Sequence, residues 1–118
     1  MARLIKRGQI WIADLNPGYG AEIHKKRPAL IIASNEINQF SHTTIVIPIC
    51  SQVFSKSIET VLLPKKSTGL EKDSVILPVF VRAIDKNRLI EKVGSISDEK
   101  LEEVEDSLKL VLGMVSLD

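Results

Sequence analysis

The sequence has one cysteine and few aromatic residues, with Phe, Trp and Tyr together making up 4% of 118 residues. A single cysteine forms no internal disulfide, and residues 1–7 lack the apolar stretch of a secretory signal. We therefore expect a protein of the reducing cytoplasm. Long apolar runs are also missing: stretches such as residues 45–50 fall far below the ~20 residues that span a bilayer. No membrane association is expected.

Residues that bind metals or nucleotides are scarce. His24, His42 and Cys50 stand at no recognised ligand spacing, and the chain contains no CxxC or HExxH motif. No glycine-rich phosphate loop connects a strand to a helix. We therefore expect no cofactor.

The remaining composition is that of one ordinary globular domain over residues 1–118, with 44% hydrophobic and 26% charged residues. The net charge of +1 argues, by itself, against a strongly basic nucleic-acid binder. The charge is nevertheless uneven, because residues 1–28 hold six basic and two acidic side chains whereas the rest of the chain is net acidic. A nearly neutral chain can thus still present one cationic surface.

Apolar and β-branched segments predict strands at residues 9–15, 28–34, 43–50, 61–63 and 74–84. Both sides of the first segment are largely apolar, as in a strand covered on two faces. Pro48 and Pro78 lie inside two of the segments, and each marks an edge position or a bulge.

The last third changes to a helical period, with apolar residues at 101, 104, 108, 111 and 112. Ser97 is a suitable N-cap and Gly113 a suitable stop. The acidic residues 102, 103, 105 and 106 indicate a solvated outer face. Short strands followed by one packed helix predict a mainly β fold, a small curled sheet or barrel with a C-terminal helix.

The loop at residues 18–27 ends in a basic cluster directly before an apolar strand. Lys25, Lys26 and Arg27 there suit a phosphate clamp, in which Arg offers a planar fork and Lys a point charge. Tyr19 could stack on a base or cap the nearby core. A solvated basic loop is the simpler interpretation of the triplet alone.

Short motifs in order along nearly the whole chain resemble the signature of the MazF/PemK toxin family. They are residues 8–11 (GQIW), 14–17 (DLNP), 20–22 (GAE), 27–32 (RPALII), 46–49 (VIPI), 74–77 (SVIL) and 82–89 (RAIDKNRL). The resemblance implies a homodimer of SH3-like barrels, the fold that MazF toxins share with CcdB toxins. It also implies a toxin that cleaves single-stranded RNA, as in mRNA, without a metal and is neutralised by an antitoxin with an acidic segment. In that reaction the ribose 2′-OH attacks its own phosphate and leaves a 2′,3′-cyclic phosphate and a 5′-OH, with the help of a base, an acid and a charge stabiliser.

The family's catalytic arginine corresponds to Arg27. Its pKa above ~12 makes it a poor base, so we expect it to stabilise the phosphorane, the alternative being a structural salt-bridged Arg. Cys50 stands where the family has Thr, either as a buried inert residue or as a thiol whose pKa falls beside Arg27. Ser51 carries a hydroxyl but points to the other face unless Pro48 creates a bulge. His24 could be the base, or an exposed loop residue.

Further RNA contacts follow from position in the motifs. Glu22 matches the family's loop acid, where it could bind base edges or the 2′-OH. Gln52 and Ser51 end the catalytic strand and could reach bases, and Phe54 could stack. An Arg-x-Asp found in some members is absent, because residues 77–79 are Leu-Pro-Val.

Two alternatives remain open. Cys50 could leave a catalytically impaired member that still binds RNA and antitoxin. A CcdB-like toxin would instead bind DNA gyrase without an enzymatic step, since fold does not determine function. CcdB toxins depend on aromatic residues at the end of the C-terminal helix, and residues 113–118 contain no Trp or Phe.

Overall fold

Seven strands form one antiparallel sheet within residues 3–51 and 60–116, the part of the chain that the computed structural model describes. The strands follow the order β4-β5-β3-β2-β1-β7, and β6 pairs with β3 beside this path. Their bounds are Gln9–Asp14 (β1), Lys26–Ile31 (β2), Thr43–Cys50 (β3), Val61–Leu63 (β4), Ser74–Ile76 (β5), Arg82–Asp85 (β6) and Leu89–Ser95 (β7). The helices are α1 (Asn35–Phe40) and α2 (Asp98–Val111), and two 3₁₀ turns are η1 (Pro78–Phe80) and η2 (Lys86–Arg88).

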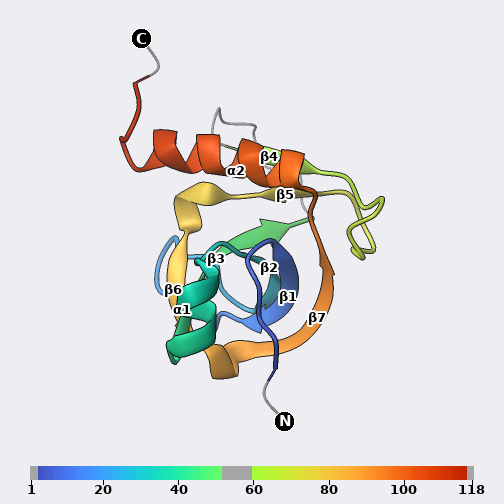
Figure 1. Cartoon of the computed structure of the whole chain (residues 1–118), viewed down its shortest axis with the longest axis vertical. Coiled ribbons are helices and arrows are strands. Elements are labelled where there is room, and N and C mark those ends of the chain that lie inside the picture. The colour runs from blue at the N-terminus through green and yellow to red at the C-terminus, as the bar shows by residue number, and fades with distance from the viewer. Residues whose placement is uncertain (1–2, 52–59, 117–118) are drawn as a thin grey trace.

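The sheet is strongly curled, and β7 bends around β1 (Figure 1). Two register shifts between β1 and β7 produce this bend, one between Ile10 and Trp11 and one between Ile12 and Ala13. The α2 helix lies across β4 and β5, whereas α1 lies toward the opposite end of the molecule (Figure 1). The expected mainly β fold with a C-terminal helix is confirmed.

Both faces of the central strands are buried. Trp11, Ala13 and Leu15 belong to one apolar cluster inside the curl, whereas Ile10 belongs to a second cluster that includes Val104 of α2. Strand alternation explains the division, because successive side chains point to opposite faces. The prediction that the first strand is covered on two sides is therefore confirmed.

The expectation of one strand at residues 74–84 is wrong. Pro78 begins the 3₁₀ turn η1 and separates β5 from β6, because proline donates no ladder hydrogen bond. Pro48 lies where β3 changes partner, from β6 at Val46 to β5 at Ile49. Pro48 lies at neither a sheet edge nor a register shift. Its missing N–H falls between the β3–β6 and β3–β5 ladders, where no hydrogen bond to a strand is needed.

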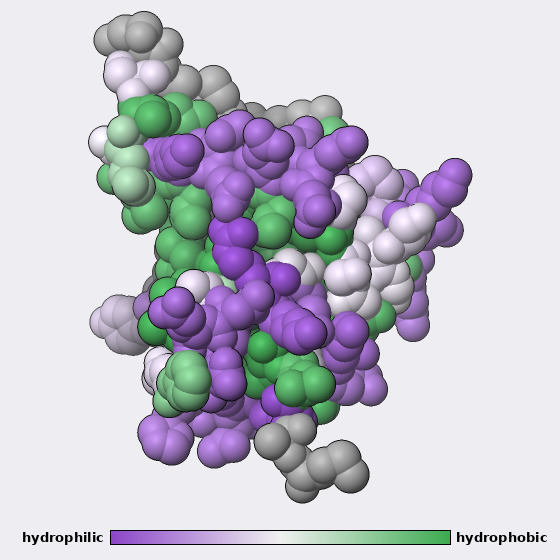
Figure 2. Space-filling view, viewed as in Figure 1, coloured by the Kyte–Doolittle hydropathy of each residue, from purple (hydrophilic) through white to green (hydrophobic). Residues whose placement is uncertain are grey.

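Capping of α2 follows the sequence prediction. The Ser97 side chain accepts a hydrogen bond from the Lys100 N–H at 3.1 Å, and Gly113 ends the helix at φ 71°. The outer surface of the helix is hydrophilic (Figure 2). Glu105, expected on this solvated face, instead pairs with Arg7 at 2.7 Å and ties the helix to the N-terminal segment. No helix in residues 3–51 or 60–116 is long and apolar enough to cross a membrane.

Candidate functional site

Arg27 lies at the start of β2, where the sheet opens. The last ladder pair between β2 and β3 joins Ala29 and Pro48, and Arg27 and Cys50 each lie two residues beyond it. The guanidinium donates from Nε to the His24 carbonyl at 2.7 Å and from Nη1 to the Cys50 sulfur at 3.4 Å. No acidic side chain of the described residues pairs with it, so the geometry does not match a salt-bridged structural arginine. Two anchors thus orient the guanidinium, and part of it stays accessible.

Cys50 is both a core residue and a contact of Arg27. It is 2% exposed, and burial raises the pKa of its thiol above the ordinary value of 9.0, an effect that Arg27 only partly offsets. The expected fall of the Cys50 pKa beside Arg27 is therefore wrong. The group is a neutral thiol at physiological pH, so it does not repel phosphate and accepts a hydrogen bond from the guanidinium.

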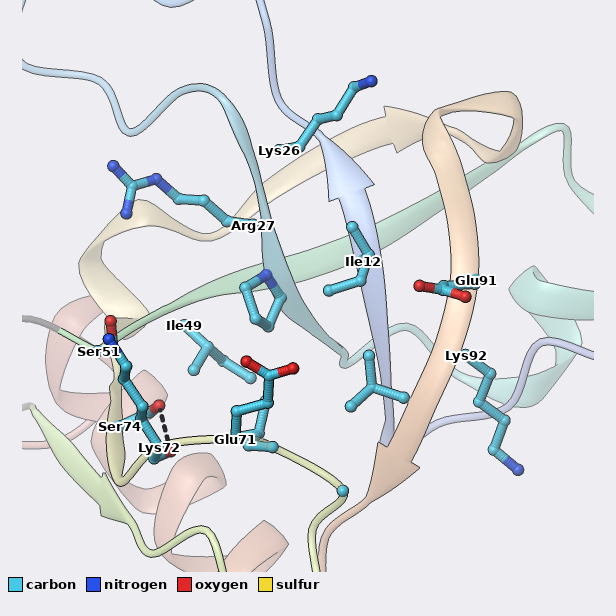
Figure 3. A pocket seen from close by; sticks show the side chains of 14 residues that line it. Ile12, Lys26, Arg27, Ile49, Ser51, Glu71, Lys72, Ser74, Glu91 and Lys92 are labelled. Atoms are coloured by element: carbon cyan, nitrogen blue, oxygen red, sulfur yellow. Dashed lines mark hydrogen bonds between the residues drawn. The ribbon is translucent and has the colours of Figure 1, made fainter.

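Ser51 points to the opposite face from Cys50. Its side chain lines a cavity that Arg27 also borders (Figure 3), but it forms no hydrogen bond with Arg27 among the described residues. Beyond Pro48, β3 pairs with β5 in regular register at Ile49 and Cys50, so no bulge up to Cys50 turns Ser51 toward the guanidinium. The structure thus places the thiol, and not this hydroxyl, beside Arg27.

The base of the loop between β1 and β2 is held by Asn16. Its Oδ1 accepts from the Lys25 N–H at 3.0 Å, and its carbonyl accepts from Arg88, which also donates to the Asp14 carbonyl at 3.0 Å. Lys25 has φ 77°, a left-handed conformation that costs a non-glycine residue of order 1 kcal/mol. These bonds hold the segment that presents the His24 carbonyl to Arg27.

The other predicted loop side chains are exposed, and none of those described forms a hydrogen bond or ion pair with the guanidinium. Glu22 accepts a hydrogen bond from the Tyr19 N–H at 2.7 Å within its own turn, and the Tyr19 side chain is 87% exposed. The His24 ring packs against Gly18, and its Nδ1 lies 3.4 Å from the Glu22 carbonyl. The structure brings the His24 backbone, and not its ring, to Arg27. Gln52 and Phe54 lie outside the described residues.

The cavity beside Ser51 is lined partly by residues that the sequence did not predict as site residues. It has a volume of about 620 Å³, and Lys26 and Arg27 line one part of it. Glu71, Lys72, Glu91 and Lys92 line other parts (Figure 3). These four come from a loop and an edge strand without a motif, so no sequence signal grouped them. The described residues include no group of three or more His, Cys, Asp or Glu placed to hold a metal ion.

Comparisons with known proteins agree on one family. Residues 6–112 match the model of the PemK-like, MazF-like toxin of type II toxin–antitoxin systems. Endoribonuclease EndoA of Bacillus subtilis (strain 168) is 38% identical over 113 residues, covering 95% of this chain and 97% of EndoA.

Solved structures show the same fold. MazF from Deinococcus radiodurans superposes with a TM-score of 0.85 at 24% identity, covering 96% of this chain and 100% of that one. An endoribonuclease from a mycobacterial species, in complex with its cognate antitoxin, gives a TM-score of 0.79 at 17% identity, covering 95% and 98%. The fold and the family model agree over nearly the whole chain, which therefore belongs to the PemK-like, MazF-like toxins of type II toxin–antitoxin systems.

Proposed function

We propose that this protein is a metal-independent, sequence-specific endoribonuclease toxin that cleaves single-stranded RNA. The observation that carries the proposal is the doubly anchored, partly accessible Arg27 guanidinium, held by the His24 carbonyl and the Cys50 sulfur. A pre-oriented guanidinium stabilises the charge that develops on a phosphorane without reorganising during the reaction. EndoA, which is 38% identical to this chain, is an endoribonuclease, and this supports endoribonuclease activity here.

The reaction is an intramolecular displacement at phosphorus. The ribose 2′-oxygen loses its proton to a base and bonds to phosphorus, the bond to the 5′-oxygen breaks, and that oxygen takes a proton from an acid. The products end in a 2′,3′-cyclic phosphate and a 5′-OH. Arg27 serves as the charge stabiliser. The general base that takes the 2′-OH proton is unassigned. The His24 ring forms no hydrogen bond with Arg27, so the loop would have to move when RNA binds for this ring to reach the 2′-OH.

Neutralisation by an antitoxin and assembly as a homodimer complete the proposal. An acidic antitoxin segment and an RNA phosphate compete for the same cations, here Lys25, Lys26 and Arg27. The mycobacterial endoribonuclease bound to its cognate antitoxin shares this fold, which supports this part of the proposal.

The test is incubation with a long, structure-free RNA in EDTA, followed by mapping of the cut ends. We expect cleavage at a short recurring sequence and ends that carry the cyclic phosphate. Arg27→Ala should lower the cleavage rate by roughly 10²–10³-fold, the usual effect of removing one stabilising donor. Lys109→Ala, which removes an exposed positive charge from α2, is the control and should cleave like the wild type. A requirement for added Mg²⁺ would refute the mechanism.

Impaired catalysis is the second candidate, because the buried thiol of Cys50 is a weak hydrogen-bond partner compared with a hydroxyl. In that case the wild type binds the same RNA but cuts slowly, and Cys50→Thr cuts much faster. Efficient cutting by the wild type would exclude this candidate. Inhibition of gyrase supercoiling with intact RNA would instead point to the CcdB-like activity.

A further inference from the structure

The cavity beside Ser51 has a rigid wall formed by the loop between β4 and β5. Gly69 and Gly94 bring this loop against β7 so closely that a Cβ on Gly94 would lie 1.9 Å from the Thr68 carbonyl oxygen. The Thr68 hydroxyl donates to the Lys65 carbonyl at 2.7 Å and accepts from the Leu70 N–H at 3.2 Å. The loop is thus fixed by its own hydrogen bonds and by backbone packing, and the cavity is preformed.

The cavity opens on the same face of the sheet as α2, which packs on this face beside the cavity. Ile12 and Pro28, a cross-strand pair, form its apolar floor together with Ile49. Its volume of about 620 Å³ falls in the ordinary range of small-ligand sites. Arg27 and Ser51 lie on one side and Glu91 on the other (Figure 3). The Arg27 guanidinium points away from this floor, and Lys26 and Arg27 border the cavity where the sheet opens (Figure 3). An RNA that passes from Arg27 around this edge of the sheet would place a nearby base on the apolar floor.

Two carboxylates point into this space, Glu71 from the loop and Glu91 from β7 (Figure 3). Both side chains are exposed, and neither forms a hydrogen bond or ion pair with another described residue. Lys26, Lys72 and Lys92 also line the cavity. Free carboxylates repel RNA phosphates, so they are unfavourable in an RNA site unless they accept hydrogen bonds from a base.

We propose that this cavity is a base-binding subsite for a nucleobase that carries an exocyclic amine, with Glu71 and Glu91 as its specificity-determining residues. Cytosine, adenine and guanine present N–H donors from an amino group, which a carboxylate accepts. Uracil presents two carbonyl oxygens around a single N–H, and these oxygens repel a carboxylate. The subsite therefore selects an amino-bearing base against uracil at one position near the cut. This inference rests on the proposed RNA cleavage.

The experiment uses two stages. Cut sites of the wild type are mapped on a long, structure-free RNA, and short oligonucleotides of the mapped site are then made with each base in turn at every flanking position. Cleavage rates are measured for the wild type, Glu71→Gln, Glu91→Gln and the double variant. Glu102→Gln, on the exposed face of α2, is the matched control. Circular dichroism and thermal melting confirm that each variant is folded.

We expect the wild type to cut an amino-bearing base at one position roughly tenfold or more faster than uracil, the size of one good hydrogen-bonded base contact. The glutamine variants should lose most of that preference at the same position only, because an amide also donates to uracil carbonyls. An amine-deleted base there, purine in place of adenine, should slow the wild type more than the variants. Glu102→Gln should keep the wild-type preference.

Failure of this inference is distinct from failure of the proposed function. A wild type that cuts no RNA overturns the proposed function and the subsite with it. A wild type that cuts RNA while the double variant keeps the same preference at every position overturns the subsite alone. Equal loss of rate for all bases in the double variant would also overturn it, since the carboxylates would then support the fold or the RNA backbone.

Discussion

Replacement of the Cys50 thiol separates its packing role from its contact with Arg27. Cys50→Ala removes one buried sulfur atom from a site that is 2% exposed. The lost transfer free energy is about 1 kcal/mol, and an unfilled space adds a similar amount. Sulfur is a weak acceptor and water can replace it on the partly accessible guanidinium, so loss of the hydrogen bond at 3.4 Å adds little to the change in stability, although it frees the orientation of the guanidinium. We expect a loss of about 1–2 kcal/mol in the free energy of unfolding, measured by urea denaturation.

The effect on cleavage follows from the two anchors of Arg27. Cys50→Ala keeps the bond to the His24 carbonyl at 2.7 Å and removes the one to sulfur. A lost restraint of about 1 kcal/mol corresponds to a roughly fivefold lower rate. Because substrate contacts are unchanged, we expect this loss in kcat and little change in KM. Cys50→Thr supplies a hydroxyl, a stronger acceptor, and should cleave at least as fast as the wild type.

Single-turnover cleavage at saturating RNA, together with urea melts of the same preparations, decides the matter. Cys50→Ala that loses stability as expected but cleaves within twofold of the wild type would show that the thiol is only a packing residue. Cys50→Thr that cleaves more slowly than Cys50→Ala would refute the anchoring argument.

Three further predictions concern pH, the cavity wall and the loop. Burial raises the pKa of Cys50, so the stability that the neutral thiol contributes is complete below about pH 9 and is lost as pH rises through the folded-state pKa. In urea melts above that pH, the free energy of unfolding of the wild type should approach that of Cys50→Ala. Gly94→Ala forces a Cβ within 1.9 Å of the Thr68 carbonyl oxygen and should cost about 2 kcal/mol or more, measured by thermal melting. Asn16→Ala removes the acceptor of the Lys25 N–H and should cost about 1 kcal/mol and slow cleavage, measured on the same RNA.

Each of these three predictions can be contradicted by a specific result. A stability difference that stays constant from pH 7 to the alkaline limit of folding would contradict the raised pKa. Gly20→Ala has nothing within 4 Å of its Cβ and bears only the cost of its φ of 58°, about 1 kcal/mol, so a smaller loss there than at Gly94 is required. Asn16→Asp keeps the acceptor oxygen, and an effect as large as that of Asn16→Ala would show that the hydrogen bond is unimportant.

The fold was predictable where periodicity is strong. The two-sided apolar pattern of β1 and the helical period of α2 correspond to buried faces in the structure. The strand β7 was not predicted, because Glu91 and Lys92 interrupt its pattern and pairing with β1 holds it. The helix α1 was also missed: it has six residues, and its stability comes from the Ser34 cap and from buried Asn38, bonded to Thr44 at 2.6 Å.

The site was predictable only in part. The motif around Arg27 indicated this residue, whose guanidinium the structure holds between the His24 carbonyl and the Cys50 sulfur. Its binding of phosphate stays a prediction. The direction of the Cys50 pKa was wrong because it depends on depth of burial, which a sequence pattern does not measure. Ser51 could not be placed either, since that required knowing that β3 continues in regular register from Pro48 to Cys50.

The sequence by itself determined the strand and helix periods, the caps of α2 and the order of motifs that identifies the family. Each of these depends on residues near one another along the chain, where local sterics and hydrogen bonding act. Only the tertiary structure decided that Arg27 contacts Cys50, and that Glu71 and Glu91 face one cavity. Those groups meet through strand register and through the close backbone packing of Gly69 and Gly94, which bring distant segments together.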